Sequence, residues 1–101
     1  MKKEILEALS KIGDLDSVRD YGIYDFSDIY DDHTFEEQIN TDDYCIDIDF
    51  TVCVDSRHPN VFTDVIINRL DIWDIWGHRV KFERYITDEE IQKAINKGFN
   101  I

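Results

Sequence analysis

Basic residues are scarce in this chain of 101 residues. It has 11 lysines and arginines against 23 aspartates and glutamates, so its formal net charge at pH 7 is −12. A field of this sign repels nucleic acid and anionic membranes, and it attracts basic protein surfaces. We therefore expect no direct binding to nucleic acid or to a membrane, and we expect a basic protein as partner.

Glycine is scarce as well, with only four residues in the chain. None of the motifs GxGxxG, GxxxxGK[ST] or GxSxG is present. In proteins that have them, these motifs let the backbone approach a phosphate or place a serine nucleophile on a sharp turn. No nucleotide, flavin or other cofactor is therefore predicted.

Cysteines are few, and long apolar runs are missing. Cys45 and Cys53 lie eight residues apart in one predicted strand. At about 3.3 Å per residue they would be about 26 Å apart, too far for a disulfide. Free thiols are typical of a reducing compartment, so we expect the cytoplasm of a bacterial or host cell. Glu4 and Glu7 interrupt the start of the chain, so neither a signal peptide nor a transmembrane helix is predicted.

No metal-binding pattern fits the dense aspartates. An EF-hand loop needs oxygen ligands at its positions 1, 3, 5 and 12 and a glycine at 6. Counted from Asp25, position 12 is Glu36, but position 5 is Ile29 and position 6 is Tyr30. The three histidines are scattered and no CxxC pair is present, so a zinc site is not predicted. A solvated acidic surface is preferred, with loose binding of divalent cations as the alternative.

The clearest periodic pattern runs from Cys45 to Asp55, CIDIDFTVCVD. Apolar and polar residues alternate along it, and the side chains of a strand point to opposite faces with a period of two. This pattern predicts a central strand over 44–55 with one apolar face and one acidic face, which carries Asp47 and Asp49. Neighbouring like charges cost stability, so an unbalanced acidic face indicates a functional reason.

Two helices are predicted near the ends of the chain. The C-terminal helix follows from Thr87–Glu90, which have the sequence of a capping box, and it is expected to end near Gly98 with Phe99 packed on its last turn. The N-terminal helix is predicted over 2–12, with a left-handed Gly13 as its stop. Its apolar stripe consists of Ile5, Leu6, Leu9 and Ile12.

The remaining segments have weaker patterns. A strand is predicted near 18–26, followed by an acidic loop with a helical turn over 25–32 as the alternative. Residues 33–41 are predicted to be a connection that contains one turn of helix. Apolar residues at helical spacing favour a helix over 60–70, although β-branched residues in that segment favour a strand. A further strand is predicted over 80–86.

Together these elements predict a single α+β domain over residues 1–101. Its antiparallel sheet has three to four strands, and the N- and C-terminal helices pack on one face together with a third helix at 60–70. Trp73 and Trp76 are interpreted as core residues, with interface anchors as the alternative. The acidic face of the sheet and the segment 14–43 are left to solvent or a partner.

The negative charge is concentrated in residues 14–55. This segment holds 14 acidic residues and one base, Arg19, for a net charge of −13, whereas the segments before and after it sum to +1 and 0. Carboxylates at i and i+2 of a strand lie about 6.7 Å apart, comparable with neighbouring phosphates of a nucleic acid. Tyrosines, which are favoured in protein interfaces, are interleaved with these acids. The predicted partner-binding residues are Asp25, Asp28, Asp31, Asp32, Asp42, Asp43, Asp47, Asp49, Tyr24, Tyr30 and Tyr44.

These features predict a non-enzymatic inhibitor that occupies the basic nucleic-acid-binding surface of a target protein or nuclease. In size and charge the chain resembles small phage-encoded anti-defence proteins, such as the anti-CRISPR and anti-restriction proteins that mimic DNA. The resemblance is one of composition, so it assigns no residue roles. A nuclease immunity protein or antitoxin is a close variant.

Two other functions stay open. The first is a structural or assembly protein, a homodimer that pairs through a sheet edge or the Trp73–Trp76 region. The second, less favoured, is a divalent-metal-dependent enzyme. The expected oligomeric state is monomer or homodimer.

Overall fold

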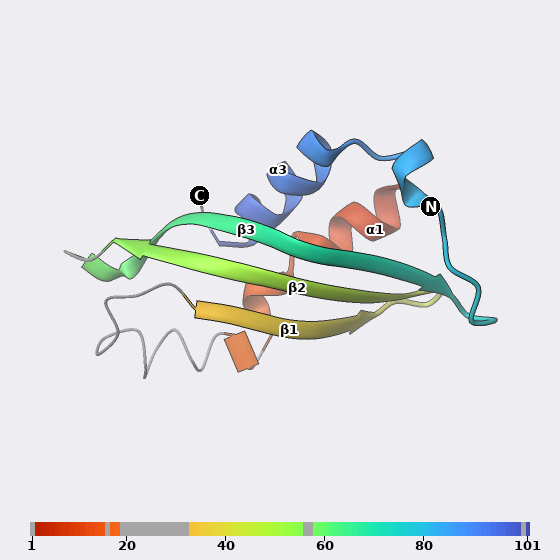
Figure 1. Cartoon of the computed structure of the whole chain (residues 1–101), viewed down its shortest axis with the longest axis horizontal. Coiled ribbons are helices and arrows are strands. Elements are labelled where there is room, and N and C mark those ends of the chain that lie inside the picture. The colour runs from red at the N-terminus through yellow and green to blue at the C-terminus, as the bar shows by residue number, and fades with distance from the viewer. Residues whose placement is uncertain (1, 16, 19–32, 56–57, 100) are drawn as a thin grey trace.

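The alternating segment forms the middle strand of a three-stranded antiparallel sheet, as predicted (Figure 1). The computed structural model describes residues 2–15, 17–18, 33–55, 58–99 and 101. In chain order its elements are α1 (Lys2–Leu9), the 3-10 turn η1 (Ile12–Asp14), β1 (His33–Asn40), β2 (Tyr44–Asp55), β3 (His58–Asp74), the 3-10 turn η2 (Phe82–Arg84) and α3 (Asp88–Gly98).

Both predicted terminal helices are present, so the α+β class is confirmed. The Lys2 ammonium lies 2.6 Å from a carboxylate oxygen of Glu90, which joins the start of α1 to the start of α3. Thr87 and Glu90 form the predicted capping box. Figure 1 shows both helices on one side of the sheet. A third helix and a fourth strand are not found among the described residues.

The core lies between the helices and the apolar face of β2. Ile46, Ile48, Phe50 and Val52 are fully buried, which matches the predicted alternation. The ring of Phe50 stacks on Phe35 of β1 with centroids 5.3 Å apart. On its other side Phe50 meets Phe99, which follows α3, at 5.9 Å. This aromatic contact ties the sheet to the C-terminal helix.

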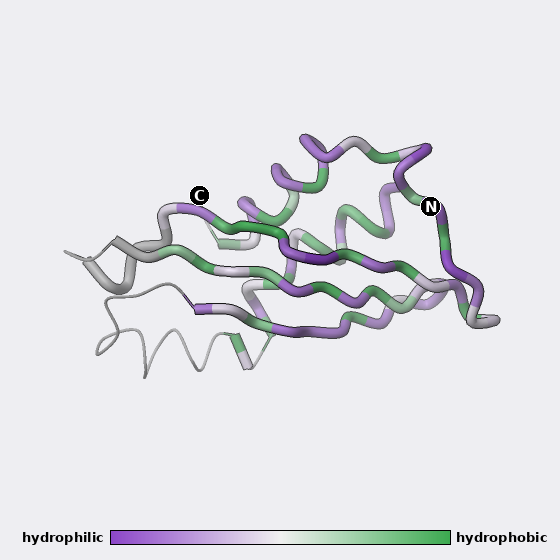
Figure 2. The backbone as a smooth tube through the Cα atoms, in the orientation of Figure 1, coloured by the Kyte–Doolittle hydropathy of each residue, from purple (hydrophilic) through white to green (hydrophobic). Residues whose placement is uncertain are grey.

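The expectation of a connection with a helical turn at 33–41 is wrong, because these residues form β1. The strand pairs with β2 from His33 opposite Val52 to Asn40 opposite Cys45. Phe35, Glu37 and Ile39 point inward. Because Glu37 is charged and follows Glu36, the sequence does not show the alternation of apolar and polar residues that is typical of a strand. Figure 2 shows β1 as mostly hydrophilic, in keeping with its position at the edge of the sheet.

The helix predicted over 60–70 is also wrong, because this segment belongs to β3. The strand pairs with β2 along nearly its whole length, with a register shift where Asp49 faces Arg69 and Phe50 faces Ile67. Asn68 is the extra residue of this bulge. The β-branched residues of this segment, which favour a strand, therefore predicted its structure better than the helical spacing of its apolar residues.

The strand predicted over 80–86 does not form either. Phe82–Arg84 make the 3-10 turn η2, and the buried side chains Phe82 and Ile86 are four residues apart, as a helical turn requires. Among the described residues, an isolated pairing of Trp73 with Arg79 is what extends the sheet beyond β3. The strand predicted near 18–26 and the loop after it fall almost wholly outside the described residues.

Two glycines allow the ends of the chain to pack closely. A Cβ atom on Gly13 would lie 2.2 Å from the carbonyl oxygen of Gly98, and one on Gly98 would lie 2.8 Å from that of Ser10. Gly13 does not have the left-handed conformation that we expected of a helix stop. Among the described glycines only Gly77 has a positive φ, of 82°. Gly13 is needed for close approach rather than for its backbone angles.

Candidate functional site

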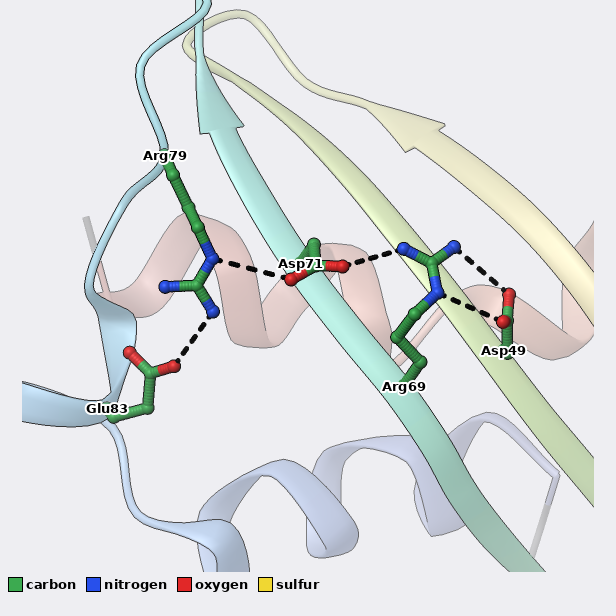
Figure 3. Close-up of polar contacts among 5 residues, drawn as sticks. All are labelled: Asp49, Arg69, Asp71, Arg79 and Glu83. Atoms are coloured by element: carbon green, nitrogen blue, oxygen red, sulfur yellow. Dashed lines mark hydrogen bonds and ion pairs between the residues drawn. The ribbon is translucent and has the colours of Figure 1, made fainter.

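The face of the sheet opposite the helices, called the outer face below, presents polar side chains in rows across the three strands. The register places Thr34, Thr51 and Ile66 in one row, Glu36, Asp49 and Arg69 in the next, Gln38, Asp47 and Asp71 in a third, and Asn40, Cys45 and Trp73 in a fourth. None of these residues belongs to the core. Figure 3 shows α1 and α3 behind the strands, away from this face.

A chain of ion pairs crosses the outer face (Figure 3). Arg69 donates from Nε to Asp49 Oδ2 at 3.0 Å and from Nη2 to Asp49 Oδ1 at 3.3 Å, a two-point pairing. Its Nη1 donates to Asp71 Oδ2 at 2.6 Å. Arg79 continues the chain, with Nε 3.4 Å from Asp71 Oδ1 and Nη2 3.2 Å from Glu83 Oε1. These contacts fix the positions of three carboxylates.

The same contacts shift the ionisation of the groups involved. Hydrogen bonds from Arg69 hold the pKa of Asp71 below its ordinary value of 3.8, and Arg79 adds to the effect. Hydrogen bonds to Asp49 and Asp71 raise the pKa of Arg69, so its guanidinium stays charged. A backbone hydrogen bond and Arg79 lower the pKa of Glu83. All of these groups are therefore ionised at neutral pH.

Asp47 differs from Asp49 in its surroundings. It faces Gln38 on one side and Asp71 on the other. Gln38 donates instead to Cys45 Sγ at 2.8 Å and to Asn40 Oδ1 at 3.4 Å. Asp47 is half-buried and has no ion pair with any described residue.

A second acidic group lies at the turn between β1 and β2. Asp42 and Asp43 are exposed there, beside a groove of about 690 Å³ between the turn and α1, which Glu4 also lines. Partial burial, followed by the charge of Asp43, raises the pKa of Glu4 above its ordinary 4.5. Burial, Glu4, Asp43 and Asp74 likewise raise the pKa of Tyr44. Burial is the larger cause of both shifts, and the neighbouring carboxylates add to it.

The structure places five of the eleven predicted partner-binding residues. Asp47 and Asp49 lie on the outer face, Asp42 and Asp43 lie at the adjoining turn, and Tyr44 is half-buried against the core. Asp25, Asp28, Asp31, Asp32, Tyr24 and Tyr30 lie outside the described residues.

Four residues of this region are not identified by sequence reasoning. Arg69 and Arg79 were counted only in the balanced second half of the chain, and the assumed helix hid that Arg69 faces Asp49. Trp76 was interpreted as core, yet its side chain is 75% exposed, and Trp73 lies on the outer face. The alternation of Arg69, Asp71 and Trp73 could have indicated a strand with these three on one face.

The described residues do not form a metal cluster or a membrane-spanning helix. In the described ranges no group of three or more histidine, cysteine or acidic side chains is arranged to hold a metal ion. Neither Cys45 nor Cys53 is in a disulfide, as expected. No helix in the described part of the chain has the length and apolar character needed to cross a membrane.

Comparison with known proteins gives no relative: no family model, no curated protein and no solved structure matches this chain.

Proposed function

We propose that this protein is a non-enzymatic inhibitor that binds a basic surface of another protein and prevents that surface from binding nucleic acid. The observation that carries the proposal is the outer face. Glu36, Asp47, Asp49 and Asp71 lie there in two neighbouring rows with Arg69. With Glu83 and Arg79, which continue the ion-pair chain, five carboxylates against two guanidinium groups leave a net charge of −3 on a face that α1 and α3 do not cover.

The spacing of these carboxylates fits a surface that binds phosphates. Neighbouring strands lie about 4.8 Å apart, and side chains two apart along a strand lie about 6.7 Å apart. Lysines and arginines that bind a nucleic-acid backbone meet negative charges at a similar spacing. The charge of −13 over residues 14–55 would also accelerate encounter with a basic target. A nuclease or another nucleic-acid-binding protein of a bacterial or host cytoplasm is the expected target, in keeping with an anti-defence or immunity protein.

The target can be identified by affinity capture. The tagged protein is immobilised, exposed to lysate from a candidate host, and eluted with NaCl from about 50 to 500 mM. We expect a basic protein to elute as salt rises. The purified target is then loaded with a fluorescent DNA or RNA duplex, and added inhibitor should displace the duplex in an anisotropy measurement. Binding that does not change over this range of salt would contradict the proposal.

Asp47 is the residue with which to test the outer face. Asp47→Lys should weaken binding to the target about tenfold, because close charge pairs in an interface contribute at least this much. Glu89→Lys is the matched control: it makes the same change in net charge at an exposed position of α3, on the opposite side. Equal effects of the two substitutions would show that overall charge, and not this face, attracts the target.

A homodimer is the second candidate function, and the exposure of Ile75 and Trp76 favours it. Large apolar side chains at the surface are often covered by another subunit. Light scattering distinguishes the two functions, since a stable dimer that dissociates on Trp76→Ala supports this candidate and a monomer opposes it.

A further inference from the structure

The turn after β3 holds two large apolar side chains out into solvent. Ile75 is 60% exposed and Trp76 is 75% exposed. Both lie between Asp74, the last residue of β3, and Gly77. The turn is at the same end of the sheet as the acidic turn between β1 and β2, because Asp74 pairs with Tyr44.

Several hydrogen bonds fix this turn. Asp74 Oδ1 accepts from the backbone N–H groups of Trp76 and His78, each at 2.9 Å. The N–H of Gly77 donates to the carbonyl of Asp74 at 3.1 Å, and the N–H of Asp74 donates to the carbonyl of His78 at 2.9 Å. Gly77 has the positive φ that such a turn needs. The backbone position of Trp76 is therefore set before any partner arrives, which reduces the backbone entropy lost on binding.

Three carboxylates lie at this end of the sheet, where Lys3 and Lys11 also line the groove beside the β1–β2 turn. Asp42 and Asp43 are exposed on the neighbouring turn, and Asp74 starts the turn itself. A two-fold contact between two such tips would bring both sets of carboxylates together, which opposes self-association at this point. A partner with positive charge around an apolar pocket would satisfy both features.

We propose that Trp76, with Ile75 beside it, is the anchor that inserts into an apolar pocket of a basic partner protein. Exposed tryptophans in well-fixed positions are typical of the few residues that dominate an interface. The adjoining carboxylates pair with lysines or arginines at the rim of that pocket. The choice of a basic partner rests on the proposed function, whereas the anchor itself can be tested without the target.

The test uses cyclodextrins as models of such a pocket. Amino-substituted β-cyclodextrin has an apolar cavity with ammonium groups at its rim, and unsubstituted β-cyclodextrin has the same cavity without charge. Titration calorimetry should show that the cationic form binds about tenfold more tightly at low salt and loses this preference at about 500 mM NaCl.

Variants show where the cyclodextrin binds. Trp76→Ala should abolish binding, and the fold should survive because the side chain is mostly exposed. Tyr85→Ala is the matched control, since Tyr85 is another exposed aromatic residue, at 58%. The double variant Asp42→Asn, Asp43→Asn should keep the binding of the neutral form and reduce the preference for the cationic form. Equal affinity for both forms, or binding that survives Trp76→Ala, would overturn the proposal.

Two further outcomes separate this proposal from its alternatives. A dimer in light scattering that is lost in Trp76→Ala would overturn it, because a second copy would then be the occupant. Asp47→Lys should leave cyclodextrin binding unchanged while it weakens target binding. If instead the captured target binds Trp76→Ala as tightly as the original protein, the anchor is wrong and the proposed function still stands.

Discussion

Arg69 determines how much of the acidic outer face is available to a partner. Its guanidinium pairs with Asp49 at two points and with Asp71 at a third. A partner that binds Asp49 must therefore compete with an existing ion pair, whereas Asp47 has no such competitor among the described residues. We expect charge reversal at Asp49 to lower stability as well as binding, because it would place a lysine beside Arg69.

Replacing Arg69 should destabilise the fold in a salt-dependent way. Arg69→Met leaves Asp49 without its counter-charge and leaves Asp71 with Arg79 alone, so the urea midpoint should fall at low salt and partly recover as salt screens the repulsion. Arg69→Lys keeps the charge but loses the two-point geometry, and its midpoint should lie in between. A midpoint that Arg69→Met leaves unchanged at low salt would show that this chain of ion pairs is only a surface feature.

Phe50 is the residue on which the core depends most. It is fully buried and contacts rings from β1 and from the segment after α3. Phe50→Ala should lower the free energy of unfolding by about 3–5 kcal/mol, a large part of the roughly 5–15 kcal/mol typical of a domain. Urea denaturation measures the loss, and Tyr85→Ala, at an exposed position, should change it by less than about 0.5 kcal/mol.

At the scale of secondary structure, β2 was predictable and β3 was not, for a physical reason. The inward side chains of β2 alternate without interruption, whereas those of β3 are Val65, Ile67, Leu70 and Ile72, with spacings of two, three and two. The spacing of three comes from the bulge at Asn68. Apolar residues spaced two and three apart resemble the pattern of an amphipathic helix. The sequence of β3 alone therefore cannot distinguish a helix from a strand with a bulge.

The part of the candidate site on β2 was predictable from the sequence, and the part that depends on β3 was not. Asp47 and Asp49 could be assigned to one face because both lie in β2, whose apolar and polar residues alternate regularly. That alternation is visible without knowledge of the neighbouring strands. Their difference in pairing was not predictable, because it depends on which residue of β3 lies opposite each of them. The exposure of Trp76 was missed for a related reason: large aromatic residues are usually buried, and only the turn geometry at Asp74–Gly77 puts this one outside.

The contact between η1 and α3 should tolerate no side chain at Gly13. Gly13→Ala would place a Cβ atom 2.2 Å from a backbone oxygen of Gly98, so the two elements must separate, at a cost of about 1–3 kcal/mol. Gly77→Ala is an informative contrast, because its added Cβ atom would meet no atom within 4 Å. The alanine would be strained only by the positive φ of 82°. Its cost should be about 1 kcal/mol. Thermal unfolding of both variants measures the difference, and a Gly13→Ala variant as stable as the original would contradict the close approach.

At the scale of the whole molecule, pH acts on stability in two opposite directions. Asp71, Glu83 and Glu90 have pKa values below their ordinary 3.8 or 4.5, so they stabilise the fold above pH 4.5 and lose this effect as pH falls through their folded pKa values. The pKa of Glu4 is raised, so its ionised form destabilises the fold at neutral pH, and protonation relieves this as pH falls towards 4.5.

The melting temperature should therefore rise slightly as pH falls from 7 towards 4.5, and it should fall as pH drops further through the folded pKa values of Asp71, Glu83 and Glu90. Glu4→Gln should raise the melting temperature at pH 7 and reduce the rise on acidification. Calorimetry from pH 3 to 7 measures the melting temperatures of the original protein and of Glu4→Gln. If Glu4→Gln lowers the melting temperature at every pH, the Glu4 carboxylate makes a favourable contact instead.

The parallel contact of α1 and α3 also bears on how the molecule is made. Leu9 and Ile12 precede Ile95 and Phe99 by more than eighty residues in the chain, yet all four belong to one buried core. This core cannot close until Phe99 has left the ribosome, so the segment around Leu9 waits without these partners. During that wait we expect repulsion among the carboxylates of residues 14–55 to keep neighbouring nascent chains apart.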